Sequence, residues 1–360
     1  MNKTELLRHA GQSIWLDFIT RHLVQSGTLG RYIDELHVSG LTSNPTIFAN
    51  ALSKSTDYDE AIREGLARGI DTEALFFDLA IADLTAAADL FRPVHDRTAG
   101  VDGWVSLEVS PLLAYDTDST IAEAKRLSTE AGRPNLFIKI PGTPEGVPAI
   151  EEAIFAGVPV NVTLLFSAEQ YRASADAYLR GIERRIAAGL SPAVASVASL
   201  FVSRWDKAVM GKVPPEFAGQ LGIGVAKQTY RDYRVLLASD RWKGLARQGA
   251  RVQRLLWAST STKDPSLPDT WYITELASPN TINTIPEETL LDFADHGELS
   301  GLLSADGGDE LIARFTAAGV DVAALAIQLQ QDGASAFVAS WNQLLEGIRS
   351  KSAALATMRS

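Results

Sequence analysis

Short apolar runs alternate along the chain with longer segments in which apolar residues recur at helical spacing. Most of the apolar runs are nearly uninterrupted, which is typical of strands buried on both faces of a parallel sheet. We therefore predict eight strands, at residues 13–19, 37–42, 104–109, 136–140, 159–166, 194–202, 252–259 and 271–276.

The segments between these runs have the features of helices. Residues 72–90 and 120–131 are predicted helices, the first because its apolar residues fall on one helical face. Ser167 and Gln170 form a capping-box start for a helix that runs toward Arg185. The alternation of strands and helices predicts an α/β fold, a (β/α)₈ TIM barrel with additional N- and C-terminal helices. A doubly wound open sheet is the alternative.

The C-terminal segment is predicted to differ from the repeating strand–helix units. Its apolar residues Phe337, Trp341, Leu344, Leu345 and Ile348 share one face of a helix. We expect the segment of about residues 321–350 to pack on the barrel, either over its mouth or as an outer-layer helix. No linker or low-complexity stretch marks a boundary, so residues 1–360 are expected to form a single domain.

Composition narrows the function classes. The chain has no cysteine, which excludes disulfides, a thiol nucleophile and a thiolate zinc site. Its net charge is −11, which disfavours nucleic acid as a partner but leaves room for a local cluster of cations that binds a phosphate. No apolar stretch approaches the roughly 20 residues of a membrane span, and the N-terminus lacks the apolar core of a signal peptide. We therefore expect no membrane partner and a cytoplasmic location.

Polar side chains lie in or directly after the predicted strands. The carboxyl ends of the strands form the active-site face of a TIM barrel, so these residues are candidates for function. Each taken singly has an ordinary structural interpretation, such as a turn residue, a threonine that favours a strand or a satisfied buried acid. The candidates are Asp17, Asn44, Glu108, Lys139, Asn161, Thr163, Ser199 and Ser259.

Lys139 is the exception, because lysine is almost never buried unless it is paired or functional. It stands between Ile138 and Ile140 on a predicted interior strand. Desolvation favours the neutral amine of a lysine, which is a nucleophile and forms a Schiff base with a ketone. The protonated imine then accepts electrons as a neighbouring carbon–carbon bond breaks. Asp17 and Glu108 are the candidates for the proton transfers that this chemistry needs.

Anion-binding candidates follow the sixth and seventh predicted strands. Arg204 can donate two hydrogen bonds to a phosphate, and the segment from Ser259 to Lys263 offers hydroxyls and one cation. The loops after the last strands of TIM barrels often bind phosphate. We expect no cofactor and no metal, because the five histidines show no metal-ligand spacing and the Gly222–Gly224 turn lacks the third glycine of a dinucleotide fingerprint.

Six stretches in this order resemble the transaldolase family. Each lies at a predicted strand, and the likeness runs from residue 11 to about residue 265 and continues in the C-terminal helices. They are Ser-Ile-Trp-Leu-Asp at 13–17, Gly-Leu-Thr-Ser-Asn-Pro-Thr at 40–46, Leu-Glu-Val-Ser-Pro at 107–111, Ile-Lys-Ile-Pro-Gly-Thr at 138–143, Asn-Val-Thr-Leu-Leu-Phe-Ser at 161–167 and Ala-Ser-Leu-Phe-Val-Ser-Arg at 198–204.

The resemblance implies a metal-independent (β/α)₈ enzyme that moves dihydroxyacetone from sedoheptulose 7-phosphate to glyceraldehyde 3-phosphate, in the non-oxidative pentose phosphate pathway. The alternatives are a fructose 6-phosphate aldolase-like enzyme and a non-catalytic barrel that binds sugar phosphates. The resemblance also implies a role for each candidate. Lys139 forms the Schiff base, Asp17 is the acid/base of carbon–carbon cleavage, and Glu108 with Thr163 positions a catalytic water. The implied substrate contacts are Asn44, Asn161 and Ser199 for the three-carbon unit, with Arg204 and Ser259 for phosphate.

One position departs from the commonest family pattern. In the commonest family pattern, an arginine lies two residues after the serine that matches Ser259. This chain has Ser261 at that position, and its nearest following cation is Lys263. We hypothesise that Lys263 replaces the arginine as a phosphate contact. The sequence leaves open whether the chain is a monomer or a homodimer.

Overall fold

The computed structural model describes residues 2–357, which contain a closed barrel of eight parallel strands in the order β1 to β8. This confirms the TIM-barrel prediction and excludes the open sheet. The strands are β1 (Ser13–Asp17), β2 (Val38–Thr42), β3 (Trp104–Glu108), β4 (Leu136–Pro141), β5 (Val160–Leu165), β6 (Ser196–Phe201), β7 (Gln253–Ala258) and β8 (Thr281–Ile285).

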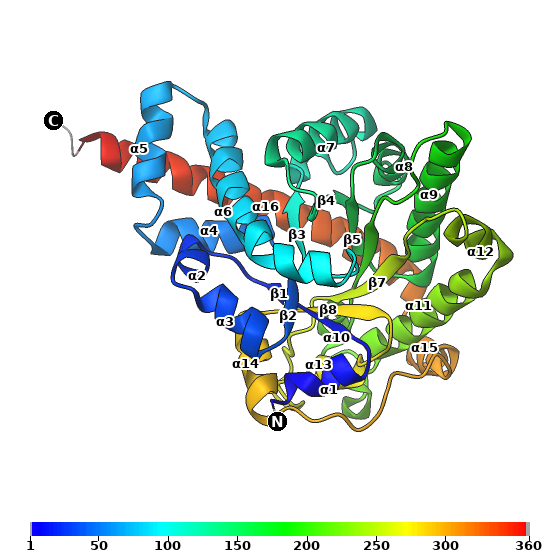
Figure 1. Ribbon diagram of the computed structural model, residues 1–360. Helices are drawn as coiled ribbons and strands as arrows, with labels where there is room; N and C mark the ends of the chain where they lie inside the picture. Colours follow the sequence, from blue (N-terminus) through cyan, green and yellow to red (C-terminus); the bar gives the residue numbers. More distant parts are fainter. Residues whose placement is uncertain (1, 358–360) are drawn as a thin grey trace.

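Helices surround the barrel and extend it at both ends of the chain (Figure 1). They are α1 (Thr4–His9), α2 (Arg21–Gln25), α3 (Thr28–Glu35), α4 (Pro45–Lys54), α5 (Asp59–Arg68), α6 (Thr72–Arg97), α7 (Thr117–Ala131), α8 (Gly146–Ala156), α9 (Ala168–Ala187), α10 (Ser203–Val209), α11 (Leu221–Ala238), α12 (Asp240–Ala246), α13 (Trp271–Glu275), α14 (Glu287–His296), α15 (Gly308–Ala317) and α16 (Val322–Thr357). Two 3₁₀ turns, Pro111–Leu113 and Pro215–Phe217, complete the set within the described residues.

Seven of the eight predicted strands are confirmed, and the last is wrong. Residues 271–276 were expected to be a strand, but they contain the short helix α13. The eighth strand is β8, which pairs with β1 and β7 and closes the barrel. A short apolar run does not by itself distinguish a buried helix from a buried strand. The true strand was not predicted because the threonines and the asparagine of β8 interrupt its apolar pattern.

The predicted helix signals are confirmed. The Ser167 side chain accepts a hydrogen bond from the backbone N–H of Gln170 at 3.1 Å and caps α9. The helix predicted at residues 120–131 is α7, which ends at Gly132 in the left-handed conformation, with φ of 56°. The helix expected at residues 72–90 continues through Pro93 to Arg97.

Aromatic side chains fill the middle of the barrel beneath its carboxyl end. The Trp104 ring stacks on Phe137 with centroids 4.1 Å apart, and Trp15 lies 6.1 Å from Phe137. Side chains two residues apart on a strand share a face, so Trp15 lies on the same face as Asp17 and Phe137 on the same face as Lys139. The aromatic layer therefore forms a floor under these two polar residues.

Gly40 on β2 makes room for this floor. A Cβ atom at residue 40 would lie 2.5 Å from the Trp15 ring. That ring is fully buried and donates a hydrogen bond from Nε1 to Asp102 at 3.1 Å, so it has little freedom to move.

We predict that Gly40→Ala lowers the free energy of unfolding by about 2 kcal/mol, because the added methyl overpacks the barrel interior. Denaturant unfolding measures this difference. Gly30→Ala on α3 is the matched control, since no atom lies within 4 Å of the added Cβ and alanine favours a helix. Equal stabilities for the two variants would contradict this account of Gly40.

Helix α16 lies across the carboxyl end of the barrel (Figure 1). Its Gln330 side chain donates from Nε2 to the carbonyl oxygens of Gly142 and Leu164, at 2.9 and 3.0 Å. The five apolar residues predicted to share one face of this helix are all buried. No helix within residues 2–357 has the length and apolar character needed to span a bilayer.

Candidate active site

A cavity of about 150 Å³ opens at the carboxyl ends of the strands. It receives side chains from every strand except β3, from the segments after β2, β6, β7 and β8, and from α16. The residues that line it are Asp17, Thr42, Asn44, Lys139, Thr163, Ser199, Phe201, Arg204, Ala258, Ser259, Ser261, Thr284, Pro286 and Phe337. Six of the eight strand-end candidates line the cavity, from positions more than 200 residues apart in sequence, and the other two, Glu108 and Asn161, each contact a lining residue.

Lys139 lies at the bottom of this cavity. Its side chain is 6% exposed, and its Nζ donates to the Ser43 carbonyl oxygen at 2.9 Å and to Glu108 Oε2 at 3.2 Å. The Phe337 ring of α16 covers it, with the centroid 5.9 Å from Nζ. The lysine is therefore desolvated, held in one position and open to the cavity.

Two carboxyl groups lie near Lys139. Burial raises the pKa of Asp17 above its ordinary value, although the Lys139 charge and a hydrogen bond from Thr42 oppose the change. Burial likewise raises the pKa of Glu108, against the opposing effect of Lys139 and with a further increase from the Asp17 charge. A raised pKa brings a carboxyl group closer to neutral pH, where a catalytic acid or base exchanges protons most effectively.

Hydroxyl groups hold Asp17 in place. The Thr42 hydroxyl lies 2.7 Å from Asp17 Oδ1 and 2.6 Å from the Thr284 hydroxyl. Thr42 was not among the predicted site residues, although it lies in one of the motif stretches. Thr284 was not among them either, because β8 was not predicted.

Asn161 and Ser199 form a buried pair beside the lysine. Ser199 Oγ donates to Asn161 Oδ1 at 2.7 Å, and Asn161 Nδ2 donates to Ser106 Oγ at 3.1 Å. Ser199 lines the cavity, whereas Asn161 contacts it through Ser199.

Thr163 and Asn44 each keep a polar group free. The Thr163 hydroxyl is buried and has no hydrogen-bond partner among the described residues. Asn44 caps α4, because its Oδ1 accepts from the Ile47 backbone N–H at 3.1 Å. The cap uses only the side-chain oxygen, which leaves the Asn44 amide N–H₂ for a ligand in the cavity.

Arg204 supplies a cation at the outer side of the cavity. Within residues 2–357 its guanidinium has no hydrogen-bond or ion-pair partner, and it lies over the Phe201 and Phe337 rings at 5.0 and 5.9 Å. Burial lowers the pKa of Arg204 from its ordinary value, while Asp332 opposes the change. A half-buried guanidinium without a partner is suited to an anion.

Ser259 and Ser261 lie beside this arginine. Ser259 has a φ of 55°, a conformation that costs free energy for a residue other than glycine and that often occurs at functional sites. Its hydroxyl lies 2.9 Å from the Ser203 hydroxyl. Both serines line the cavity and offer donors to an anion held by Arg204.

The structure does not bring Lys263 to this cavity. Its exposed side chain lines a different cavity of about 80 Å³, together with Asp206 and Asp264. The physical reason is the path of the loop after β7, in which Thr262 donates to the Asp269 carbonyl oxygen at 2.9 Å. Among the described residues that line the cavity, Arg204 is the only cation besides Lys139.

Phe337 is a site residue that the sequence did not identify as such. It was predicted only as part of the apolar face of the C-terminal helix. The spacing shows that the residue is buried, whereas its contact with Lys139 and Arg204 depends on how α16 crosses the barrel. No group of three or more potential metal ligands occurs within residues 2–357.

Comparison with known proteins agrees with this arrangement. Residues 14–348 match the family described as Transaldolase/Fructose-6-phosphate aldolase. A transaldolase of Saccharopolyspora erythraea is 46% identical over 354 residues, covering 96% of each chain. A transaldolase of Thermobifida fusca is 45% identical over 359 residues, covering 97% of this chain and 98% of that one. The chain belongs to the transaldolase/fructose-6-phosphate aldolase family.

Membership of this family confirms the resemblance found in the sequence and the expectation of a transferase. A third relative, a transaldolase of a Parafrankia species, is 44% identical over 354 residues, covering 95% of this chain and 96% of its own. The likeness to all three spans the barrel and extends to the region of α16. It is therefore not confined to the motif stretches around Lys139.

Proposed function

We propose that the enzyme is a transaldolase that moves a dihydroxyacetone unit from sedoheptulose 7-phosphate to glyceraldehyde 3-phosphate through a Schiff base on Lys139. The observation that carries this proposal is the position of Lys139 Nζ. It is buried, it lies 3.2 Å from Glu108, and it faces a cavity that also contains Asp17 and Arg204. An amine so placed can react with a ketone while two carboxyl groups exchange protons.

The first step forms the imine. The neutral Lys139 amine attacks the ketone carbon of the donor, and the oxygen leaves as water after it is protonated. Glu108 is the nearest carboxyl group to Nζ, and Thr163 has a buried hydroxyl without a partner. We assign this pair to hold the water that leaves in imine formation and returns in imine hydrolysis.

The second step breaks a carbon–carbon bond. Asp17 takes the proton from the hydroxyl next to the breaking bond, an aldehyde leaves, and the electron pair moves into the protonated imine to give an enamine. The acceptor aldehyde then adds to this enamine, and Asp17 returns the proton to the new hydroxyl. Asn44, Asn161 and Ser199 are assigned to contact the hydroxyls of the three-carbon unit.

The phosphate of each sugar is assigned to Arg204, Ser259 and Ser261. Arg204 has no ion-pair partner among the described residues, and a phosphate would supply the missing charge. This assignment replaces the hypothesis that Lys263 binds the phosphate.

Variants of the two cations test the phosphate assignment. We predict that Arg204→Ala raises KM for phosphorylated donors about 100-fold, because charge-assisted hydrogen bonds are lost. Lys263→Ala, the matched control, is expected to stay within about threefold of the parent enzyme, since hydrogen bonds to phosphate are not lost. Steady-state kinetics with phosphorylated and unphosphorylated donors measures both. A larger effect of Lys263→Ala than of Arg204→Ala would contradict the assignment.

Reductive trapping tests the proposed reaction. The protein is incubated with fructose 6-phosphate and borohydride, and the masses of the intact chain and its peptides are measured. A reduced three-carbon adduct on the peptide that contains Lys139 is expected. Absence of the adduct from folded protein that binds the sugar would contradict the Schiff-base mechanism.

A second arm distinguishes transferase from aldolase. Adding an acceptor aldehyde before the borohydride is expected to remove the adduct from a transaldolase, because the three-carbon unit passes to the acceptor. An aldolase instead releases free dihydroxyacetone with or without acceptor. The full-length likeness to transaldolases supports the first outcome.

We also propose that the chain acts as a single domain in the cytoplasm. The contacts of α16 with the barrel support the first point. Charged sugar phosphates do not cross the hydrocarbon core of a bilayer unaided, which supports a location in the compartment that holds them. Whether the enzyme acts as a monomer or a homodimer is tested by light scattering.

A further inference from the structure

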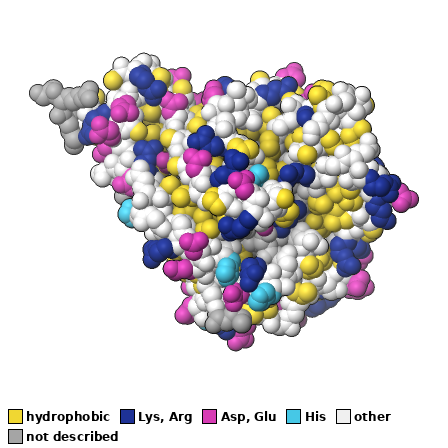
Figure 2. All heavy atoms as spheres, viewed as in Figure 1, with side chains coloured by type: hydrophobic (Ala, Val, Ile, Leu, Met, Phe, Trp, Pro, Cys, Tyr) yellow, Lys and Arg dark blue, Asp and Glu magenta, His cyan; other side chains and the backbone are white. Residues whose placement is uncertain are grey.

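A second, larger cavity lies at the opposite end of the barrel, where the strands begin. Its volume is about 1070 Å³, and it lies between α1, the end of α6, the loop at residues 98–103 and the start of β7. Figures 1 and 2 turn this face toward the viewer, and Lys and Arg side chains gather around a hollow near its centre. The proposed reaction uses no residue of this cavity.

The lining of this cavity is basic, whereas the chain as a whole is acidic. Its charged residues are four arginines and one aspartate, namely Arg8, Arg97, Arg251, Arg254 and Asp102. The net charge of the chain is −11, so a general surplus of cations does not explain this concentration of arginines. Positive charges held near one another raise the local concentration of anions.

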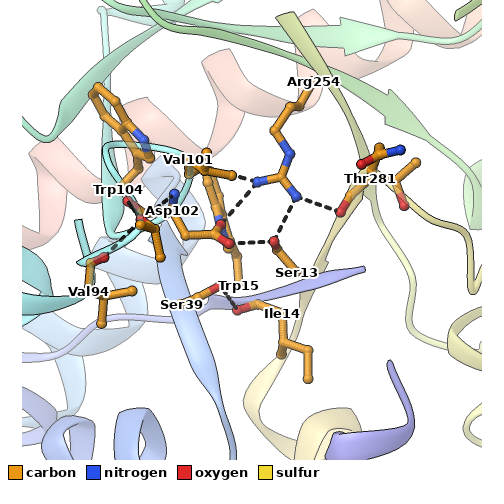
Figure 3. Close-up of polar contacts among 12 residues, drawn as sticks. Ser13, Ile14, Trp15, Ser39, Val94, Val101, Asp102, Trp104, Arg254 and Thr281 are labelled. Atoms are coloured by element: carbon orange, nitrogen blue, oxygen red, sulfur yellow. Dashed lines mark hydrogen bonds and ion pairs between the residues drawn. The ribbon is translucent and has the colours of Figure 1, made fainter. Parts of the chain in front are cut away.

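One arginine and the aspartate neutralise each other. The Arg254 guanidinium lies 3.1 Å from Asp102 Oδ1, and it also donates to Ser13 Oγ and to the Thr281 carbonyl oxygen at 2.7 and 2.9 Å. Figure 3 shows this closed network, in which Asp102 also accepts from Ser13. The pair forms a fixed wall of the cavity and leaves the other arginines without a carboxylate from the lining.

Arg251 is held in place by neutral groups only. Its Nη1 donates to the carbonyl oxygens of Ala99 and Gly100, at 3.1 and 3.0 Å. Gly100 has a φ of 76°, and a Cβ atom there would lie 2.3 Å from Arg251 Nη1. The backbone loop is thus shaped around the guanidinium. Its Nε and Nη2 have no hydrogen-bond partner within residues 2–357, and its charge is not balanced by a carboxylate.

The two remaining arginines are also available to a ligand. Arg97 is exposed and has no hydrogen-bond, ion-pair or ring partner in the described part of the chain. Arg8 is half exposed, and its nearest carboxylate, Glu5, is 3.9 Å away. Three cations, on α1, on α6 and on the segment just before β7, therefore line one cavity.

We propose that this cavity binds an oligophosphate, that is, a chain of two or more phosphate groups either free or carried by a nucleotide. Guanidinium groups donate paired hydrogen bonds to phosphate oxygens. Three cations on separate segments can each contact a different phosphate of a linked chain, which a single phosphate does not allow. The volume is at the upper end of the range for small-molecule sites, which is enough for a nucleoside triphosphate.

Titration calorimetry of the full-length protein with inorganic tripolyphosphate tests the proposal. We expect binding that weakens as salt is raised, with one site remaining in Arg204→Ala, where the proposed phosphate contact of the catalytic cavity is removed. Arg97→Glu is expected to raise Kd at least about tenfold, because a cation becomes an anion at the cavity edge. Arg97 has no hydrogen-bond, ion-pair or ring partner in the described part of the chain, so this variant is expected to fold normally.

Arg63→Glu on α5 is the matched control. Arg63 also has no hydrogen-bond or ion-pair partner in the described part of the chain, and it does not line this cavity. Its variant is expected to bind tripolyphosphate as the parent does. Equal Kd values for the Arg97 and Arg63 variants would overturn the proposal, as would loss of all binding in Arg204→Ala or no binding at low salt.

Adenosine triphosphate distinguishes the two sources of the ligand. A Kd equal to that of tripolyphosphate supports a site for the phosphate chain alone. A Kd at least tenfold lower supports a nucleotide site. In either case Arg97→Glu is expected to raise the Kd for adenosine triphosphate. An unchanged Kd in that variant would overturn the proposal. Because these measurements do not use turnover, they are independent of the proposed transaldolase reaction.

Discussion

Replacing Lys139 by methionine is expected to lower transaldolase turnover at least about 10⁴-fold, because removal of a covalent nucleophile removes the whole reaction path. The borohydride-trapped adduct is expected to disappear with it. Methionine preserves most of the side-chain volume, so Phe337 and the aromatic floor keep their packing. Coupled-enzyme kinetics and peptide mass spectrometry measure the two effects.

Lys351→Met is the matched control for this variant. Lys351 on α16 is also partly buried and lies 2.8 Å from a carboxylate, that of Asp59, but it is remote from the cavity. Its replacement is expected to leave turnover within about threefold, because it changes no group at the reacting atoms. Trapping that persists in Lys139→Met, or turnover within tenfold of the parent, would show that another group is the nucleophile.

The second large effect is expected from Asp17→Asn. This variant keeps Lys139 and is expected to form the imine, so a ketone without a cleavable bond, such as dihydroxyacetone, remains trappable. Cleavage of the sugar is expected to slow by about 10²–10⁴-fold, because an amide does not accept the hydroxyl proton. Single-turnover kinetics separates imine formation from cleavage.

The pH dependence of the parent enzyme follows from the raised pKa of Asp17. As a base, Asp17 acts only when ionised, so the cleavage rate rises with pH through its pKa. Since burial raises that pKa, the rise is expected above the ordinary value of 3.8. In Asp17→Asn the pH–rate profile loses this ascending limb. A variant that retains both the limb and the parent cleavage rate would show that the assignment is wrong.

The same substitution is expected to stabilise the fold at neutral pH. A raised folded-state pKa means that the protein loses stability as pH rises from the unfolded-state pKa through the folded-state one. Asparagine does not ionise, so Asp17→Asn avoids this loss, and the gain vanishes below pH 3.8. Thermal melts at several pH values test this difference. Thr42→Val, which keeps the carboxylate but removes its hydroxyl partner, does not share the stabilisation.

Much of the fold was readable from the sequence because burial on both faces requires apolar residues throughout a strand. Strands β3 and β4 were predicted nearly to their ends for this reason. β8 failed because its sequence, Thr-Ile-Asn-Thr-Ile, includes three polar residues that are nevertheless buried. Hydrogen bonds from remote segments satisfy some of these groups, such as the one from Gln12 Nε2 to the Thr281 hydroxyl at 2.9 Å. Such partners, distant in sequence, leave no periodic signal.

The residues of the candidate site likewise fall into those that the sequence predicted and those that it did not. Asp17, Glu108 and Lys139 were found because an ionisable residue in an apolar strand is conspicuous. Phe337 and Thr284 were missed because apolar and threonine side chains are ordinary in helices and strands, and only their position relative to Lys139 and Asp17 distinguishes them. In the loop after β7 the conspicuous cation is Lys263, but the structure places it outside the cavity that Ser261 lines.

The sequence by itself determined the barrel class, seven of its strands and the candidate lysine with its two neighbouring acids. These depend on the chemistry of single residues and on short-range periodicity, both of which are written along the chain. The tertiary structure alone decided the distance between Lys139 and Glu108, the cover that α16 provides and the position of Arg251 against Gly100. Each of these joins segments far apart in sequence, and their approach depends on packing and loop paths that no local pattern encodes.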